Sequence, residues 1–150
     1  MSRAQLFVCP ILLLFLVSAL AQEGSHSGNT NRNAKVIETD DMKLAMKADK
    51  LQAAGKYDEA LKVYAQAIDL KGRYTPFVYH NRGMFYLHRA KASQDRQLRV
   101  TDLQHAIDDF EASIRLGATS KDELNRGLEK IATRANLDEA TKLLEQTTRQ

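Results

Sequence analysis

A pattern of apolar and small residues recurs in the carboxy-terminal two thirds of this chain. Leu44 and Ala60 are 16 residues apart, and Leu124 and Ala140 are separated by the same 16. Ala106 lies 34 residues before Ala140. A fixed period of this length indicates repeated helical hairpins, each of which buries its apolar side against its neighbours. The sequence therefore predicts an all-α stack of helical hairpins.

The first copy of the pattern predicts two helices separated by a glycine. Leu44, Ala48 and Leu51 occupy one face of the first helix, at the i, i+4 and i+7 spacing of an amphipathic helix. Gly55 is expected to end this helix. The second helix has apolar or small residues at Tyr57, Ala60, Tyr64, Ala67, Ile68 and Leu70. Small residues such as Ala48 and Ala60 let the paired helices approach closely, and Tyr64 fills the space beside them.

The second copy begins at Pro76, which suits the first turn of a helix, with Thr75 placed to cap that helix. Its two helices are predicted from two sets of residues: Tyr79, Gly83 and Tyr86, then Ala106, Phe110, Ser113, Ile114 and Leu116. We expect Gly83 and Ala106 to face each other where these two helices are closest.

An insertion lengthens the second copy. Tyr79 and Ala106 are 27 residues apart, against the 16 of the first copy, and the extra residues fall within Lys91–Leu103. Because this segment contains neither Gly nor Pro, we expect longer helices that meet in a turn near Ser93–Asp95.

The third copy follows Gly117, which is expected to end the preceding helix. Ser120 and Glu123 have the spacing of a capping box, and residues 136–139 have the pattern of another helix start. The apolar and small residues of this copy are Leu124, Leu128, Ile131, Ala140 and Leu144. No polar capping helix follows Thr147, so the last helix is expected to cover itself, or to meet a partner or a second copy of the chain.

These residues resemble the tetratricopeptide repeat. The family pattern W-x₂-L-G-x₂-Y…A-x₃-F aligns with Leu44, Lys47-Ala48, Leu51, Ala60 and Tyr64 in the first copy. Lys47 departs from the pattern, and Gly127-Leu128 reverses its usual Leu-Gly order. The resemblance covers about residues 41–150. It implies a right-handed solenoid of three degenerate repeats, the second with lengthened helices, that serves as a protein-binding scaffold.

The resemblance also implies a concave groove lined by the first helix of each repeat. By this correspondence the partner-binding residues are Asp49, Phe77, His80, Met84, Leu87, His88 and Glu129. An apolar centre with acidic flanks suits an apolar protein or peptide segment with basic neighbours. The alternative for Phe77 and Leu87 is that they pack in the core.

Some members of the family hold a carboxy-terminal carboxylate with a clamp of Lys, Asn, Asn, Lys and Arg. The matching positions here are Ala45, Asp49, Asn81, Asp122 and Arg126. Only Asn81 and Arg126 fit, and the two acidic residues would repel a carboxylate. Carboxylate binding is therefore not expected.

Two other functions are weighed against a scaffold. His80, Met84 and His88 lie at i, i+4 and i+8, and imidazole with thioether suits copper. Eight residues of helix separate the two histidines by about 12 Å, which is too far for both to reach one ion easily. The other alternative is contact with an acidic membrane surface or an acidic partner. The basic residues of the insertion would make this contact, and they are Arg89, Lys91, Arg96 and Arg99.

An enzyme is not expected, and no cofactor is predicted. The sequence after residue 21 has no nucleophile and base at a recognisable spacing, no phosphate-binding glycine loop and no histidine pair with a glutamate between them. Cys9 is the only cysteine, so thiol chemistry is excluded once the amino-terminal segment is removed.

The first 21 residues are typical of a secretory signal peptide. Arg3 precedes an uncharged apolar run at residues 6–20, which ends in Ala19-Leu20-Ala21, a site that signal peptidases cut. An uncleaved membrane anchor is disfavoured because a span needs about 20 apolar residues and this run is shorter. We expect cleavage near Ala21 and export to the periplasm or secretion.

Residues 22–39 are rich in Gly, Ser, Asn and Thr and are expected to form a disordered tether before a single domain at 40–150. The formal charge of +3 falls to +2 without residues 1–21, because Arg3 is the only charged side chain among them. So small a charge argues against a nucleic-acid-binding protein.

Overall fold

The computed structural model describes residues 39–121, 123–128 and 132–149. The expected signal peptide and nearly all of the expected tether lie outside these residues. The described residues form helices and contain no strand, which confirms the predicted all-α class. The helices are α1 (Asp40–Ala53), α2 (Tyr57–Asp69), α3 (Thr75–Ala92), α4 (Arg96–Ala118), α5 (Glu123–Leu128) and α6 (Arg134–Arg149). Within the described ranges, no helix combines the length and the apolar character that a membrane span requires.

The first hairpin, α1 and α2, forms as the sequence predicts. Gly55 has a φ of 75°, a left-handed conformation that glycine adopts readily. The N–H of Gly55 donates to the carbonyl of Gln52 and the N–H of Lys56 to that of Leu51, both at 2.9 Å, so the last carbonyls of α1 are satisfied. Ala48, Ala60 and Tyr64 are fully buried where the two helices pack.

A buried carboxylate joins the start of α1 to the start of α3. Asp41 is 1 % exposed and accepts a hydrogen bond from the backbone N–H of Tyr74 at 2.7 Å. Gly72 lies so close that a Cβ there would overlap the carboxylate of Asp41. This contact fixes the first hairpin against α3, and no local pattern in the sequence indicates it.

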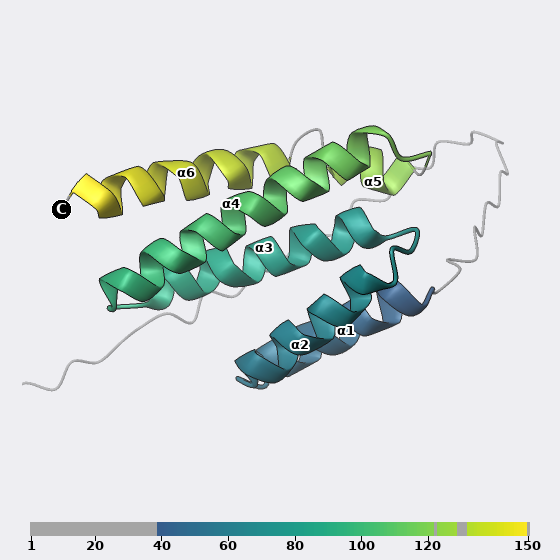
Figure 1. The fold of residues 1–150 in the computed structure, drawn as a ribbon, viewed down its shortest axis with the longest axis horizontal. Coiled ribbons are helices and arrows are strands. Elements are labelled where there is room, and N and C mark those ends of the chain that lie inside the picture. The colour runs from purple at the N-terminus through teal and green to yellow at the C-terminus, as the bar shows by residue number, and fades with distance from the viewer. Residues whose placement is uncertain (1–38, 122, 129–131, 150) are drawn as a thin grey trace, which may run out of the picture. The chain divides into compact units, whose positions relative to one another are not determined.

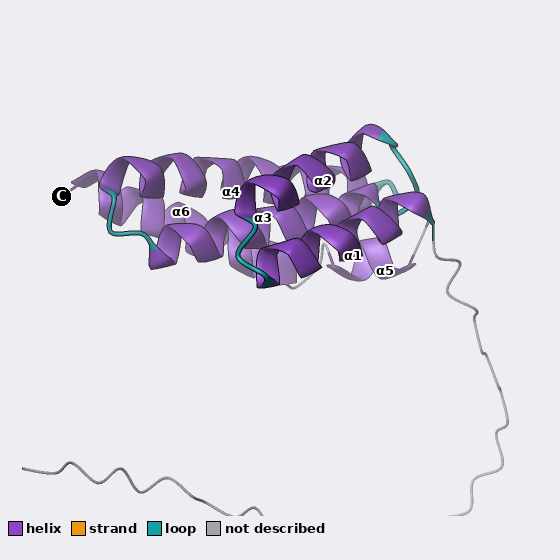
Figure 2. Cartoon of the chain, turned by 90° about the horizontal axis from the view of Figure 1, so that it is seen from below, coloured by secondary structure: helices purple, strands orange, loops and turns teal. Residues whose placement is uncertain are grey.

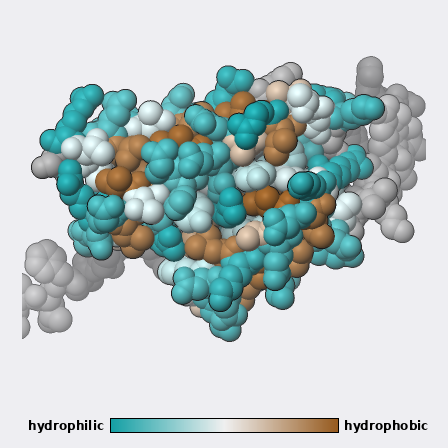
Figure 3. Space-filling view, viewed as in Figure 1, coloured by the Kyte–Doolittle hydropathy of each residue, from teal (hydrophilic) through white to brown (hydrophobic). Residues whose placement is uncertain are grey.

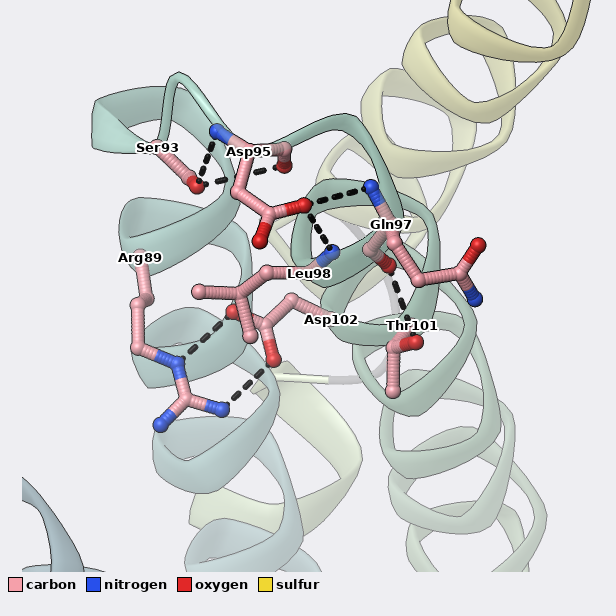
Figure 4. Close-up of polar contacts among 7 residues, drawn as sticks. All are labelled: Arg89, Ser93, Asp95, Gln97, Leu98, Thr101 and Asp102. Carbon is pink, nitrogen blue, oxygen red and sulfur yellow. Dashed lines mark hydrogen bonds and ion pairs between the residues drawn. The ribbon is translucent and has the colours of Figure 1, made fainter.

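The second hairpin, α3 and α4, contains the insertion. The helices have 18 and 23 residues and are joined by a three-residue turn at 93–95, as predicted. Asp95 caps α4 by accepting from the N–H groups of Gln97 and Leu98 at 2.8 and 3.1 Å. Ser93 binds Asp95 in turn, and together these bonds order the turn (Figure 4).

Two expectations for the second hairpin need correction. Thr75 does not cap α3: it is the first residue of the helix, and its buried hydroxyl has no hydrogen-bond partner among the described residues. A Cβ on Gly83 would lie 2.7 Å from Cε1 of Phe110, so Gly83 faces that ring rather than Ala106. Ala106 is fully buried and packs in the same core cluster as Phe110.

The third copy departs furthest from a regular hairpin. α4 runs through Gly117 to Ala118, α5 has only six residues, and α6 begins at Arg134 rather than near residue 136. Figures 1 and 2 show α6 lying along α4, and α4 lies between α3 and α6. Ala140 of α6 is fully buried in the cluster that contains Leu87 and Leu103.

The described outward face of α6 is polar. Its exposed residues include Asp138, Lys142, Glu145 and Gln146, whereas Leu137, Leu143 and Leu144 pack towards α3 and α4. Nε of Arg96 donates to the carbonyl of Thr147 at 3.1 Å, near the negative end of the helix dipole. The apolar side of the last helix therefore packs within the chain.

We expect the amides of residues 99–103 to exchange slowly with deuterium. The N–H of Arg99 donates to the carbonyl of Asp95 at 3.0 Å, and Asp102 and Leu103 are buried in α4. Backbone groups bonded in a packed helix exchange only through opening reactions. Hydrogen–deuterium exchange read residue by residue by NMR checks this expectation, with exposed Gln94 of the turn as the internal comparison. Exchange as fast in 99–103 as in the turn would contradict it.

Candidate partner-binding groove

A groove opens where α3 and α4 extend beyond the turn of the first hairpin. α1 and α2 have 14 and 13 residues and pack along only part of the longer α3, as Figure 1 shows. The groove has a volume of about 780 Å³. We call it the tip groove. It is lined by Asp49, Gln52 and Ala53 of α1, Tyr57 and Tyr64 of α2, Asn81, Met84, Phe85, His88, Arg89 and Ala92 of α3, Ser93, and Leu98 of α4.

The lining of the tip groove includes apolar side chains from three helices, Tyr57 of α2, Met84 of α3 and Leu98 of α4, which we call its apolar wall. Tyr57 is 48 % exposed and Leu98 39 % exposed, and Met84 is half-buried. The ring of Tyr57 meets the buried ring of Phe85 edge to face, with centroids 5.7 Å apart. Figure 3 shows apolar residues exposed in separate patches among hydrophilic ones on the face viewed there. Exposed apolar side chains that converge on a cavity are what a partner would cover.

The lining of the groove also includes a carboxylate. The hydroxyl of Tyr64 donates to Oδ1 of Asp49, and Nδ2 of Asn81 donates to Oδ2 at 3.3 Å. Burial, together with the adjacent Asp49, raises the pKa of Tyr64, so the phenol keeps its proton and remains a donor. Asp49 is half-buried, and it makes no ion pair with any residue that the structure describes.

An ion pair between α3 and α4 lies at the tip groove, whose lining includes Arg89. Nε and Nη2 of Arg89 donate to the two carboxylate oxygens of Asp102 at 2.7 and 2.6 Å (Figure 4). Asp102 is fully buried, and the guanidinium also lies 5.2 Å from the centroid of Phe85. The hydrogen bond to Asp102 is the main reason that the pKa of Arg89 is raised.

A second pair joins the same two helices. Arg82 donates to both oxygens of Asp109 at 2.8 and 2.7 Å. Burial raises the pKa of Asp109, and the bonds from Arg82 partly oppose that effect. Neither pair was expected from the repeat pattern. The sequence nevertheless contains a signal for both pairs, because Arg82 precedes Arg89 by seven residues and Asp102 precedes Asp109 by seven. Two ion pairs between antiparallel helices require such equal spacings.

The structure brings together three of the seven predicted groove residues: Asp49, Met84 and His88 line the tip groove. Leu87 does not, because it is fully buried in the core between α3 and α4. Phe77 is half-buried and lies outside the lining of the groove. Glu129 lies outside the described residues. The side chains that sequence reasoning missed include Tyr57 and Leu98, which belong to second helices rather than first helices.

His80 is also a correction to the predicted groove. Its ring is 9 % exposed, Nδ1 lies 2.9 Å from the hydroxyl oxygen of Thr133, and the ring packs near that of Phe110. The predicted copper ligands are thus divided, since His80 is engaged in the core while Met84 and His88 line the groove. Across the described ranges, no three His, Cys, Asp or Glu side chains are grouped so that they could hold a metal ion.

Three of the four basic residues of the insertion have partners within the chain. Arg89 pairs with Asp102, Nζ of Lys91 lies 2.5 Å from Oε1 of Glu139, and Arg96 binds the end of α6. The contacts of Lys91 and Arg96 brace the ends of α3 and α4 beside the turn at 93–95 against α6. They also reduce the positive charge that the insertion offers to an acidic surface.

We expect the protein to lose stability as the pH falls through the range in which histidine titrates. Burial lowers the pKa of His80 below its ordinary value of 6.5, so the unfolded chain takes up this proton at a higher pH than the folded chain. The stabilisation is present above pH 6.5 and is lost as the pH falls towards the folded-state pKa.

Urea unfolding at several pH values between about 7.5 and 5.5 measures this loss, since most carboxylates titrate lower. The His80→Gln variant, whose amide can still bind Thr133, should show a smaller loss of unfolding free energy over this range. The exposed His88→Gln variant is the control and should behave like the unaltered chain. An unchanged pH dependence in His80→Gln would mean that another group is responsible.

No protein-family model matches this chain, and the comparisons with curated proteins and with solved structures likewise found no match.

Proposed function

We propose that this chain is an exported, tetratricopeptide-repeat-like scaffold that holds a segment of a partner protein in the tip groove. The observation that carries the proposal is the meeting of Tyr57, Met84 and Leu98 across one open groove. Its volume of about 780 Å³ lies within the usual range of binding cavities. Aromatic and apolar anchors of this kind supply most of the affinity of a protein interface.

The finer description of the fold belongs to this proposal. A solenoid of tetratricopeptide-like hairpins is supported by the small residues Ala48, Ala60 and Ala106, which are fully buried where helices cross. It is also supported by Ala140, at the expected 34 residues after Ala106. The third hairpin is abbreviated, because α5 has six residues and α6 packs on α4.

The proposal assigns a binding role and no catalytic residue. The two charged side chains at the groove, Asp49 and Arg89, are held by hydrogen bonds from or to their neighbours. Such bonds fix the position of a charge, which suits recognition. The partner is a protein or peptide, and neither nucleic acid nor a membrane is proposed.

Photo-crosslinking tests the proposal. A photoreactive phenylalanine analogue replaces Tyr57 in the groove in one variant and exposed Met46 on α1 in the other. Illumination in the native compartment is expected to give a defined adduct from position 57 and none from position 46. Mass spectrometry of the adduct identifies the partner and the attached segment. Equal labelling from both positions, or labelling from 46 alone, would place the binding surface elsewhere.

Export is part of the same proposal. The apolar run at residues 6–20 and the Ala19-Leu20-Ala21 site support it. We expect the exported protein to begin at or near Gln22. Amino-terminal sequencing of protein recovered from outside the cytoplasm checks this, and an intact Met1 there would contradict cleavage.

A further inference from the structure

We infer that Asp49 selects partner segments that carry a lysine or arginine side chain next to an apolar anchor. The inference rests on the proposed function, because it concerns the ligand of the tip groove. It adds the chemical identity of one contact, which the apolar wall alone does not determine.

The first support is the way in which Asp49 is held. The buried phenol of Tyr64 donates to one carboxylate oxygen, and the side-chain amide of Asn81 donates to the other. Each carboxylate oxygen has two lone pairs, so each keeps one acceptor site that these bonds do not use. The carboxylate is thereby fixed in orientation and still able to accept from an incoming donor. An ammonium or a guanidinium is a strong donor for such a position.

The second support is the charge balance of the groove. Among the residues that line the groove, Arg89 is the only lysine or arginine, and its guanidinium makes a two-bond ion pair with Asp102. No ion pair to Asp49 occurs in the part of the chain that the structure describes, and the half-buried carboxylate lies in a groove with an apolar wall. A charge that is partly removed from water without a counter-ion is unfavourable, and a cation from a partner would relieve this.

The third support is the arrangement of the two surfaces. Asp49 lies on α1, while Met84 and Leu98 come from α3 and α4, and all three line the same groove. A segment bound there would place an apolar side chain on the wall and a neighbouring cation at the carboxylate. An acidic segment would instead bring a like charge to Asp49, which disfavours it.

A selection from random linear peptides displayed on phage tests the inference with the chain from Gln22 onward. We expect the retained peptides to share an apolar residue with a lysine or arginine at a fixed offset. One such peptide is then synthesised with the cationic residue intact and with glutamine in its place. Dissociation constants of both peptides are measured for the unaltered protein, for Asp49→Asn and for the control Asp69→Asn, whose exposed carboxylate lies at the far end of α2.

The glutamine peptide and the Asp49→Asn variant should each weaken binding about tenfold, and combining them should weaken it little further. Asp69→Asn should leave the dissociation constant unchanged. The peptide substitution carries the test by itself if thermal melting shows that Asp49→Asn does not fold.

Two other outcomes separate the inference from the proposed function. Peptides that bind without a cation, yet lose binding in a Met84→Glu/Leu98→Glu variant, would overturn the role of Asp49 and leave the groove in place. The proposed function fails, and the inference with it, if the selection yields no peptide. It also fails if the Met84→Glu/Leu98→Glu variant binds every selected peptide as the unaltered protein does.

Discussion

Replacing Arg89 with methionine is expected to lower the free energy of unfolding by about 3 kcal/mol. The substitution leaves Asp102 without its cation, and Asp102 is 0 % exposed. An unpaired carboxylate in the core loses both its charge partner and two hydrogen bonds, and it cannot recover them from water. The loss of the guanidinium beside the rings of Phe85 and Tyr86 adds to the effect.

Urea unfolding of Arg89→Met and of Arg89→Met/Asp102→Leu measures this. The double variant should recover most of the loss, because apolar residues of similar volume replace a buried pair with little penalty. Arg149→Met is the control, since Arg149 and Glu145 are an exposed pair whose removal should change the unfolding free energy by less than about 1 kcal/mol. If Arg89→Met is as mild as this control, the pair does not hold α3 against α4.

Replacing Gly83 with alanine is expected to destabilise the protein by about 1–2 kcal/mol, although alanine is the better helix former. The added Cβ would lie 2.7 Å from Cε1 and 2.9 Å from Cδ1 of Phe110. Phe110 is 0 % exposed and packs in a core cluster, so its ring can move away only by displacing its neighbours. Overpacking therefore outweighs the gain in helix propensity of about 1 kcal/mol.

A matched glycine gives the opposite expectation. A Cβ on Gly127 in α5 would have no described atom within 4 Å, so Gly127→Ala should be neutral or stabilising. Ala106→Leu should act like Gly83→Ala, with a loss of about 1–3 kcal/mol, because Ala106 is fully buried in the cluster that holds Phe110. Urea midpoints measure all three. Equal midpoints for Gly83→Ala and Gly127→Ala would contradict the packing described here.

The helices of the first two hairpins could be predicted from the sequence because their signals are local. Gly55 ended α1 as expected, and the spacing of Ala60 and Tyr64 identified the buried face of α2. The long helices that meet in a turn at 93–95 followed from the absence of Gly and Pro in the insertion. Each of these features depends on residues within a few turns of one another. Periodicity reports such relations directly.

The groove could be predicted only in part, because its walls come from helices that the repeat pattern treats separately. The resemblance assigned binding residues to first helices alone, which placed fully buried Leu87 in the groove and omitted Leu98 of α4. The part of α3 that extends past the first hairpin packs against α4. No local pattern in the sequence indicates that these two helices border the groove together. The position of His80 was missed for a similar reason, since its partner Thr133 is 53 residues away.

The central claim is that the tip groove binds the partner, and the dissociation constant of the crosslinked partner tests it most directly. Met84→Glu/Leu98→Glu places two charges on the apolar wall, and Met46→Glu/Leu70→Glu places the same two changes on exposed positions outside the groove. Circular dichroism and thermal melting first establish that both variants are folded. We predict that the groove variant binds the purified partner at least about tenfold more weakly, or about 1.4 kcal/mol, while the control binds as the unaltered chain does. Equal dissociation constants for the two folded variants would contradict the claim.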